Sequence, residues 1–306
     1  MKVVVFGYHE IGYVCFEELV KFGAEILCLF THKDAPEEEI WFKKPAAIAE
    51  KNNIPVYTPE TLKDNAWVEL IKSLSPDIIF SFYYRNMIRK EILDIPKIGA
   101  FNLHGSLLPK FRGRCPVNWV MIAGESKTGV TLHRMVEKPD AGDMVAQKAC
   151  EITFDDTAYT VFKKMADAAR LLMREILPQL KDGTFKSIPQ TGPSSYFGGR
   201  RPEDGLISWD KDALSIYNLT RAVTHPYPGA FTYLDGRKLY LWKTYPEATQ
   251  VNAQPGKIIS ERPLTVNTGS GILKLLKVQM EGETEMDGEQ FVREHDLENK
   301  ILGGNF

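Results

Sequence analysis

Short apolar runs alternate with amphipathic segments through the first 100 residues of the chain. The apolar runs are rich in β-branched and aromatic residues, which is typical of strands covered on both faces. They lie at Lys2–Phe6, Glu25–Phe30, Asp77–Phe82 and Ala100–Leu103. Helical segments between them include Ile11–Phe22, which ends before Gly23, and Asn65–Leu74, which ends before Pro76. This order predicts right-handed crossovers and an α/β, Rossmann-like, mostly parallel sheet with helices on both faces.

The pattern changes after Leu103. A loop that contains Gly and Pro leads to two further strand candidates, Val130–Val136 and Met144–Ile152, and then to a long amphipathic helix from about Thr157 to Lys181. The segment Ser187–Pro202 is rich in Gly, Pro, Ser and Arg, which favours a linker between domains. We therefore expect a first domain over residues 1–200.

The remaining residues, 201–306, have a different texture. A helix is expected over Lys211–Thr224, and short strand candidates then alternate with turn signals such as Pro-Gly and Asp-Gly. These strands are Ala230–Leu234, Lys238–Lys243, Lys257–Ser260, Leu264–Asn267 and Ile272–Gln279. Five strands at this spacing suggest a small barrel or an open sheet, and we expect a C-terminal β-barrel-like (OB-like) domain.

Charge and cysteine content narrow the function classes. The 306 residues include 38 Lys plus Arg and 40 Asp plus Glu, a formal charge of −2, so overall charge alone indicates neither a nucleic acid nor a membrane partner. The four cysteines form no C-x-x-C spacing and have no neighbouring His cluster, so we expect free thiols and no metal site. No apolar run approaches the roughly 18 residues of a membrane-spanning helix, and the expected location is cytoplasmic.

The first glycine turn follows the first strand candidate and reads G-Y-H-E-I-G from Gly7 to Gly12. Its position is that of a dinucleotide-binding fingerprint, but the middle glycine of G-x-G-x-x-G is missing. That glycine is where a pyrophosphate approaches the backbone most closely. A tight turn that leads into a helix is therefore the preferred interpretation, with nicotinamide or flavin binding as the weaker alternative.

The densest polar cluster follows the strand candidate Ala100–Leu103 and reads N-L-H-G-S-L-L-P-K-F-R-G-R from Asn102 to Arg114. In open α/β sheets, ligands bind at the carboxyl ends of strands. Asn102 and His104 are two residues apart, so on an extended backbone their side chains point to the same side. An amide beside an imidazole can polarise one carbonyl group while the imidazole moves a proton.

A second polar element, P-D-A-G-D from Pro139 to Asp143, lies between the two later strand candidates of the first domain. A buried carboxylate that reaches a histidine raises the histidine pKa and fixes the ring. Asn102, His104 and Asp140 together would suit acyl transfer. From the residues alone, each also has an ordinary alternative: a structural histidine, or a common Asp-Ala-Gly-Asp turn.

The run F-N-L-H-G-S-L-L-P-K-F-R-G, followed about 35 residues later by P-D-A-G-D, resembles the folate-dependent formyltransferase family. The resemblance covers essentially the whole chain. It implies an enzyme that transfers a formyl group from 10-formyltetrahydrofolate to an amine. It also implies that His104 transfers the proton, Asn102 stabilises the oxyanion and Asp140 raises the pKa of His104.

The same resemblance places the folate co-substrate against two short segments, mostly through backbone groups. Their residues are Asn86, Met87, Ile88, Val136, Glu137, Lys138, Pro139 and Asp140. Arg114 is implied as a ligand-binding residue, and its guanidinium is suited to a bidentate contact with a phosphate or carboxylate.

Within the family, the runs F-S-F-Y-Y-R, G-V-T-L-H-R-M-V and R-A-V-T-H-P-Y-P-G-A-F resemble the branch that formylates UDP-4-amino-4-deoxy-L-arabinose in lipid A modification and polymyxin resistance. Its members carry a second domain downstream, so this chain is expected to be a stand-alone enzyme or an excised domain. The family run F-G-R-R-x-P has an extra glycine here, at Gly198-Gly199. The expected partner is a small-molecule sugar nucleotide, with no nucleic acid and no membrane; the oligomeric state stays open.

Three alternatives remain at this point. A methionyl-tRNA formyltransferase would be expected to carry a basic loop after the second strand, but that region, His32–Lys44, has Glu37, Glu38 and Glu39 at its centre. A phosphoribosylglycinamide formyltransferase resembles the first domain only. A 10-formyltetrahydrofolate hydrolase or a folate-binding protein could have the same three polar residues without an amine acceptor.

Overall fold

The computed structural model describes residues 1–34 and 40–303, which form two compact units. The first unit comprises residues 1–116, 127–152 and 162–198, and the second comprises residues 117–126, 153–161 and those from 199 onward. The acidic residues Glu37, Glu38 and Glu39, on which the argument against an RNA acceptor depended, lie outside the described residues.

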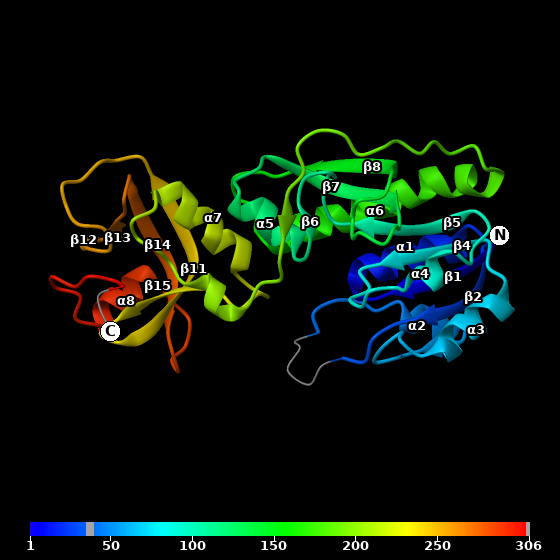
Figure 1. Ribbon diagram of the computed structural model, residues 1–306. Helices are drawn as coiled ribbons and strands as arrows, with labels where there is room; N and C mark the ends of the chain where they lie inside the picture. Colours follow the sequence, from blue (N-terminus) through cyan, green and yellow to red (C-terminus); the bar gives the residue numbers. More distant parts are fainter. Residues whose placement is uncertain (35–39, 304–306) are drawn as a thin grey trace. The chain divides into compact units, whose positions relative to one another are not determined.

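The first unit is built on a seven-stranded sheet with the order β3-β2-β1-β4-β5-β7-β8 (Figure 1). Its strands are β1 (Lys2–Gly7), β2 (Glu25–Phe30), β3 (Val56–Tyr57), β4 (Ile78–Phe82), β5 (Gly99–His104), β7 (Lys127–Arg134) and β8 (Met144–Glu151). The first five strands in this order pair in parallel, whereas β7 and β8 are antiparallel to their neighbours. The predicted mostly parallel, Rossmann-like sheet is confirmed.

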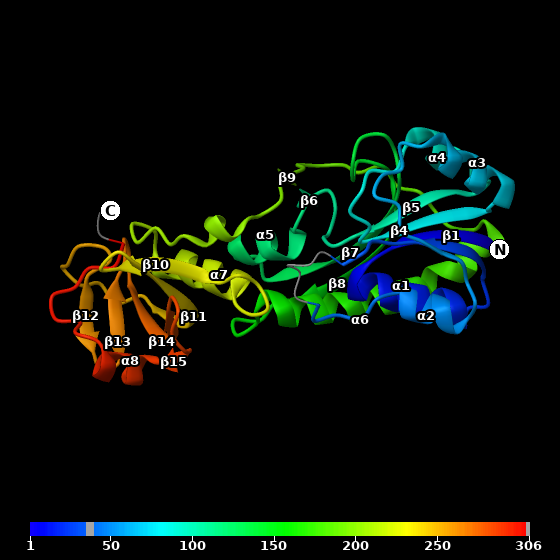
Figure 2. The same ribbon diagram turned by 90° about the horizontal axis from the view of Figure 1, so that it is seen from below.

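Helices cover both faces of this sheet (Figure 2). One face is covered by α1 (His9–Lys21) and by the part of α6 (Ala158–Asp182) that belongs to the first unit, with α2 (Ala46–Lys51) beside α1; the other face is covered by α3 (Asn65–Leu74) and α4 (Lys90–Leu93). Alternate residues of β1 face opposite layers, so Val4 and Phe6 enter one core cluster with Ile71 of α3 and Ile92 of α4.

The contact between α1 and α6 contains a buried carboxylate. Glu18 of α1 is 3% exposed, and it accepts hydrogen bonds from Arg174 at 2.6 and 3.1 Å and from Arg170 at 3.0 Å. The hydrogen bond from Arg174, with those from Arg170 and Lys21, outweighs burial and lowers the pKa of Glu18 to about 2. The two helices are therefore joined through a carboxylate that stays ionised at neutral pH.

We expect Glu18→Gln to lower the free energy of unfolding at pH 7 by about 1–3 kcal/mol, because the arginines lose the charge that they face. The pKa is depressed from 4.5, so the stabilisation is present above pH 4.5 and is lost as pH falls toward 2. Urea unfolding at pH 7 and at pH 3 tests this. The difference in free energy of unfolding between the parent and Glu18→Gln should be smaller at pH 3 than at pH 7. The control Glu69→Gln, in an exposed pair with Lys72, should change stability little at either pH.

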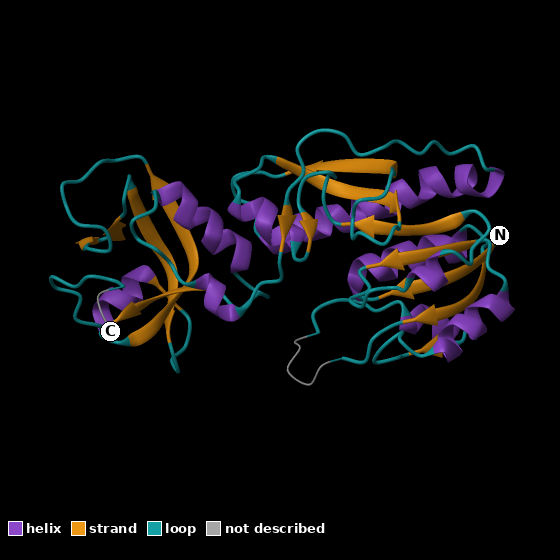
Figure 3. Ribbon diagram, in the orientation of Figure 1, coloured by secondary structure: helices purple, strands orange, loops and turns teal. Residues whose placement is uncertain are grey.

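The second unit contains a mainly antiparallel sheet with helices packed on it (Figure 3). The strand order is β10 (Ala230–Leu234), β11 (Arg237–Glu247), β14 (Ile272–Met280), β13 (Leu264–Asn267) and β12 (Ile258–Glu261), with β15 (Met286–Asp287) paired to β14. Helix α7 (Ala213–Val223) packs on β10 and β11, and α8 (Gly288–Glu294) packs on β13, β14 and β15. The predicted helix and short strands of the C-terminal part are confirmed, and the strands form an open sheet: β10 and β12 lie at opposite ends of the strand order, so the described pairs do not close a barrel.

The segment that composition assigned to a linker is bound to the first unit as far as Gly198. Ile188 forms a bridge with Met144, and β9 (Tyr196–Phe197) pairs with β6 (Arg112–Gly113). We call residues 187–197 the strap. The short 3₁₀ helix η1 (Pro202–Gly205) and then α7 follow the strap along the chain. Helix α5 (Pro116–Ile122) begins at residue 116, where the first segment of the first unit, residues 1–116, ends. None of the helices within residues 1–34 and 40–303 combines the length and the hydrophobicity needed to cross a bilayer.

Candidate active site

Strand β5 brings Asn102 and His104 to its carboxyl end, on one face of the sheet. Its antiparallel neighbour β7 places His133 opposite Asn102 and Thr131 opposite His104. Because directly opposed residues of paired strands share a face, these four polar side chains lie together. Sequence reasoning identified Asn102 and His104 but missed His133, although it lies in the run G-V-T-L-H-R-M-V. Only the register of two antiparallel strands reveals it.

His104 is enclosed, with 6% of its surface exposed. Its Nε2 lies 2.7 Å from the carbonyl oxygen of Phe111, and a carbonyl can only accept, so Nε2 carries the hydrogen. Its Nδ1 lies 3.5 Å from Oδ1 of Asp140. Burial lowers the pKa of His104 below its usual value, and the opposing effect of Asp140 is the smaller one. The implied role of Asp140 therefore has the right sign, but the net direction is opposite to that expected from the carboxylate alone.

Asp140 reaches His104 from the loop between β7 and β8. Its backbone is in the left-handed region, with φ of 52°, and its Oδ2 accepts a hydrogen bond from the N–H of Gly113 at 2.9 Å. Its Oδ1 lies 3.5 Å from Nε2 of His133 as well as from His104. Burial raises the pKa of Asp140, but the two histidines and the Gly113 N–H outweigh it and lower this pKa to about 2. Asp140 is therefore ionised at neutral pH.

Asn102 is oriented by His133. The Nδ1 of His133 lies 2.8 Å from the carbonyl oxygen of Arg134, which makes Nδ1 the donor and leaves Nε2 as an acceptor. That Nε2 lies 3.1 Å from Nδ2 of Asn102 and accepts from it. A primary amide has two N–H groups, so this bond fixes the amide plane and leaves a second N–H for an oxyanion.

The loop after β5 is fixed by Thr131 and Gln147. Thr131 Oγ1 donates to the carbonyl oxygen of Ser106 at 2.6 Å and accepts from the N–H of Leu108 at 3.1 Å, and Gln147 Nε2 donates to the Leu108 carbonyl at 2.9 Å. At Gly105 a Cβ atom would lie 2.3 Å from the Tyr83 hydroxyl oxygen, so a larger residue would require the Tyr83 side chain to move. These constraints place the Phe111 carbonyl against His104.

The residues implied for folate binding lie on two loops of the first unit, one after β4 and one after β7. Met87 is 64% exposed and Val136 is 45% exposed, and Glu137 and Lys138 are also exposed. Ile88 belongs instead to the core under α3 and α4, so any contact that it makes with a ligand involves its backbone.

The remaining implied ligand residues are less enclosed than His104. Asn86 Nδ2 donates to the Glu60 carbonyl at 3.1 Å, and Pro139 is half-buried directly before Asp140. Arg114 is exposed, and its backbone N–H donates to the Phe197 carbonyl at 2.9 Å. Within the described parts of the chain, no group of three or more His, Cys, Asp or Glu side chains is arranged to hold a metal ion.

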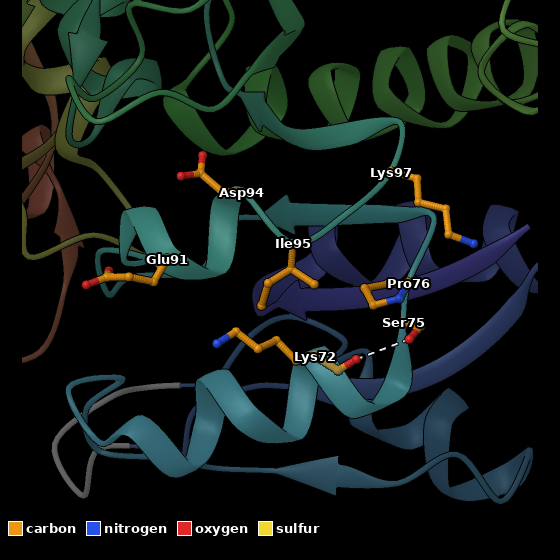
Figure 4. Close-up of a pocket in the computed structure, with 7 residues that line it drawn as sticks. All are labelled: Lys72, Ser75, Pro76, Glu91, Asp94, Ile95 and Lys97. Carbon is orange, nitrogen blue, oxygen red and sulfur yellow. Dashed lines mark hydrogen bonds between the residues drawn. The ribbon is translucent and has the colours of Figure 1, made fainter.

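A surface hollow of about 390 Å³ lies at the other edge of the same sheet, at the amino ends of β4 and β5 (Figure 4). Its lining includes lysines and acidic residues, and it contains none of the predicted site residues. The lining residues are Lys72, Ser75, Pro76, Glu91, Asp94, Ile95 and Lys97. Ligands of such sheets bind at the carboxyl edge, so this hollow is not the candidate site.

Two protein-family models match this chain, one over each part of it. The family described as formyl transferase matches residues 1–177, and the formyl transferase C-terminal domain matches residues 200–296. The chain belongs to the formyl transferase family. It is therefore a transferase, and its catalytic type agrees with the amide, imidazole and carboxylate found together at β5.

Solved structures of formyl transferases share the fold. WlaRD, a sugar 3N-formyl transferase crystallised in the presence of dTDP and 5-N-formyl-THF, is 19% identical over 93% of this chain and 99% of that chain, with a TM-score of 0.69. The N-formyltransferase of Helicobacter canadensis, in complex with folinic acid and dTDP-3-aminofucose, is 19% identical over 90% and 99%, with a TM-score of 0.66. The methionyl-tRNA formyltransferase of Clostridium thermocellum is 20% identical over 83% and 95%, with a TM-score of 0.55.

Proposed function

We propose that this formyl transferase moves the formyl group of 10-formyltetrahydrofolate to the amine of a sugar nucleotide, UDP-4-amino-4-deoxy-L-arabinose. The observation that supports formyl transfer most directly is the enclosed pair His104–Asp140 beside an amide oriented by His133. A buried neutral imidazole beside an ionised carboxylate can take up a proton, and a fixed amide N–H can stabilise a developing oxyanion.

The reaction requires one bond to form and one to break. The neutral amine attacks the formyl carbon, the carbonyl electrons move to oxygen, and the C–N bond to the folate then breaks to release tetrahydrofolate and the N-formyl sugar nucleotide. The amine loses a proton, and the departing folate nitrogen gains one. His104 would accept the proton at Nδ1, since Nε2 already donates to Phe111, and Asp140 would stabilise the resulting imidazolium.

The residues assigned to the folate donor fit this role. A flat heteroaromatic ring with hydrogen-bonding edges can be held by backbone groups and apolar side chains, which the exposed segments at Met87 and Val136 offer. Both segments belong to the same unit as His104. Arg114, exposed just beyond the catalytic loop, would meet an anionic group of a ligand.

The acceptor choice is supported by sequence runs rather than by geometry. F-S-F-Y-Y-R, G-V-T-L-H-R-M-V and R-A-V-T-H-P-Y-P-G-A-F are similar to the branch that formylates UDP-4-amino-4-deoxy-L-arabinose. Two structural relatives were crystallised with dTDP or a dTDP-amino sugar, which is consistent with a sugar-nucleotide acceptor of either base. The sugar and the base are therefore what an experiment must decide.

We expect a screen of acceptors with 10-formyltetrahydrofolate to give a kcat/KM for UDP-4-amino-4-deoxy-L-arabinose at least about tenfold above that for any dTDP-3-amino sugar, because pocket contacts distinguish related acceptors by this order. Mass spectrometry of the sugar nucleotide and absorbance of the released tetrahydrofolate measure both products. Two further reactions are run as controls: one with initiator methionyl-tRNA as the acceptor and one without any acceptor.

Each result has one interpretation. A higher rate with a dTDP-amino sugar would replace the acceptor and keep the reaction. Salt-sensitive binding and formylation of methionyl-tRNA would make the RNA the acceptor. Formate release without any amine would identify a hydrolase, and no turnover of 10-formyltetrahydrofolate under any condition would leave a binding protein.

A further inference from the structure

We propose that Gln190 is a positioning residue of the formyl-transfer site: its side-chain amide ties the Asp140 turn to Arg112 in the loop after β5 and so holds Asp140 against His104. The inference rests on the proposed function of His104 and Asp140. Gln190 belongs to the strap, more than 80 residues along the chain from His104, in the segment that composition alone assigns to a linker.

The contacts of Gln190 fix the orientation of its amide. Nε2 donates to the carbonyl oxygens of Asp140 at 2.8 Å and Gly142 at 2.7 Å, and Oε1 accepts from Nη2 and Nε of Arg112 at 2.6 and 3.1 Å. Carbonyl groups can only accept and a guanidinium can only donate, so the reverse orientation would lose all four bonds. One side chain therefore ties the Asp140 turn to the loop after β5.

The Asp140 turn needs such support. Asp140 has a positive φ of 52°, a conformation that costs an L-residue free energy unless its surroundings hold it. The two Gln190 bonds act on the carbonyl groups of Asp140 itself and of Gly142, two residues later. Without them the turn can relax, and the carboxylate would then withdraw from His104.

The rest of the strap holds the loop that contacts the other nitrogen of His104. Ser195 Oγ accepts from the N–H of Phe111 at 2.8 Å, and the Ser195 carbonyl accepts from the N–H of Arg112 at 2.9 Å. At Gly113, with φ of 96°, a Cβ would lie 2.1 Å from the Phe197 carbonyl, so the two segments touch at a point that admits only glycine. The Phe111 carbonyl that accepts from His104 is thus also fixed by the strap.

The charged and titratable groups that act on His104 are Asp140, His133 and Arg112. Asp140 raises the pKa of His104, whereas the other two lower it, and Asp140 has the largest effect of the three. Loss of Gln190 frees Asp140 and Arg112 together. Because Asp140 has the larger effect on the pKa of His104, that pKa should fall when Gln190 is lost.

The test uses Gln190→Met, which keeps the length of the side chain and removes all four bonds, and Gln190→Glu, which keeps the acceptor for Arg112 and removes the donor to Asp140 and Gly142. The matched control is Gln179→Met, in α6, whose amide bonds only to the Glu175 carbonyl of its own helix in the described structure. We expect both Gln190 variants to lower kcat by about 10- to 100-fold with KM values within about threefold of the parent, and Gln179→Met to match the parent.

A double-mutant cycle with Asp140→Asn separates positioning from a general loss of structure. If Gln190 acts through Asp140, Gln190→Met should cost less than about threefold in the Asp140→Asn background. Additive losses, or unchanged kcat in both Gln190 variants, would overturn the proposal.

NMR titration of the His104 imidazole in the free protein provides a readout that needs no acceptor. The midpoint should move to lower pH in Gln190→Met, which adds no charge, and stay in place in Gln179→Met; a midpoint that does not move in Gln190→Met would overturn the proposal. A parent that formylates no amine while the midpoint shifts as expected would refute the proposed function and leave the positioning role of Gln190 intact.

Discussion

Replacing His104 by Ala is expected to lower kcat by about 10² to 10⁴, the contribution of a positioned proton-transfer group, with KM values near those of the parent. His104 is the residue whose Nδ1 faces the ionised Asp140 while its Nε2 donates to Phe111. In the proposed reaction, removal of the ring leaves the amine proton without an acceptor. Steady-state kinetics with saturating 10-formyltetrahydrofolate measure the loss.

His104→Gln separates proton transfer from hydrogen bonding. Glutamine can donate to the Phe111 carbonyl and fills most of the volume of the imidazole, but it cannot take up a proton at neutral pH. We expect the same order of loss as in His104→Ala, with circular dichroism spectra like those of the parent. His295→Gln, in the second unit, provides the histidine control and should retain the parental rate. A near-parental kcat in the His104→Gln variant would show that the imidazole does not transfer the proton.

The strands β1, β2, β4 and β5 and the helices α1 and α3 could be predicted because these strands are apolar runs and these helices have a regular repeat and an end signal; β3, α2 and α4 were not predicted, because segments of two to six residues are too short to show a clear period. The direction of β7 and β8 could not be predicted either. A short apolar run gives no direction, and antiparallel pairing is decided by how the loop after β5 returns the chain to the sheet. The same limit left barrel and open sheet equally compatible with the short strands of the second unit.

The site was predictable where residues are close in sequence and not where they meet only in space. Asn102 and His104 are two residues apart on one strand, and the family motif adds Asp140. His133 could be identified as a site residue only from its pairing with Asn102 across β5 and β7. Gln190 was hidden for a further reason: Gly, Pro and Ser are typical both of free linkers and of segments that pack closely on another loop, as the strap does at Gly113.

Asp140→Asn is expected to lower kcat by about 10² or more and to move the acid limb of the pH–rate profile to lower pH. The substitution keeps the shape of the side chain and an acceptor for the Gly113 N–H, and it removes the charge that faces His104. Asp140 raises the pKa of His104, so without this charge the imidazole holds its proton less well. The neutral imidazole would then persist to lower pH, yet it would be a weaker proton acceptor.

The lower pKa of His104 in Asp140→Asn keeps the ring neutral to lower pH but makes it a weaker proton acceptor, so the pH–rate profile can separate the two effects. Burial holds the pKa of His104 below its ordinary value, so activity that needs the neutral ring is retained at neutral pH and falls as pH drops through that pKa. In Asp140→Asn the plateau is lower and extends to more acidic pH. Asp143→Asn, in the same turn but with its carboxylate near Ser187, should leave both plateau and midpoint in place. An acid limb that stays in place or moves to higher pH in Asp140→Asn would contradict the electrostatic role of Asp140, because burial and the other charges around His104 are the same in both enzymes.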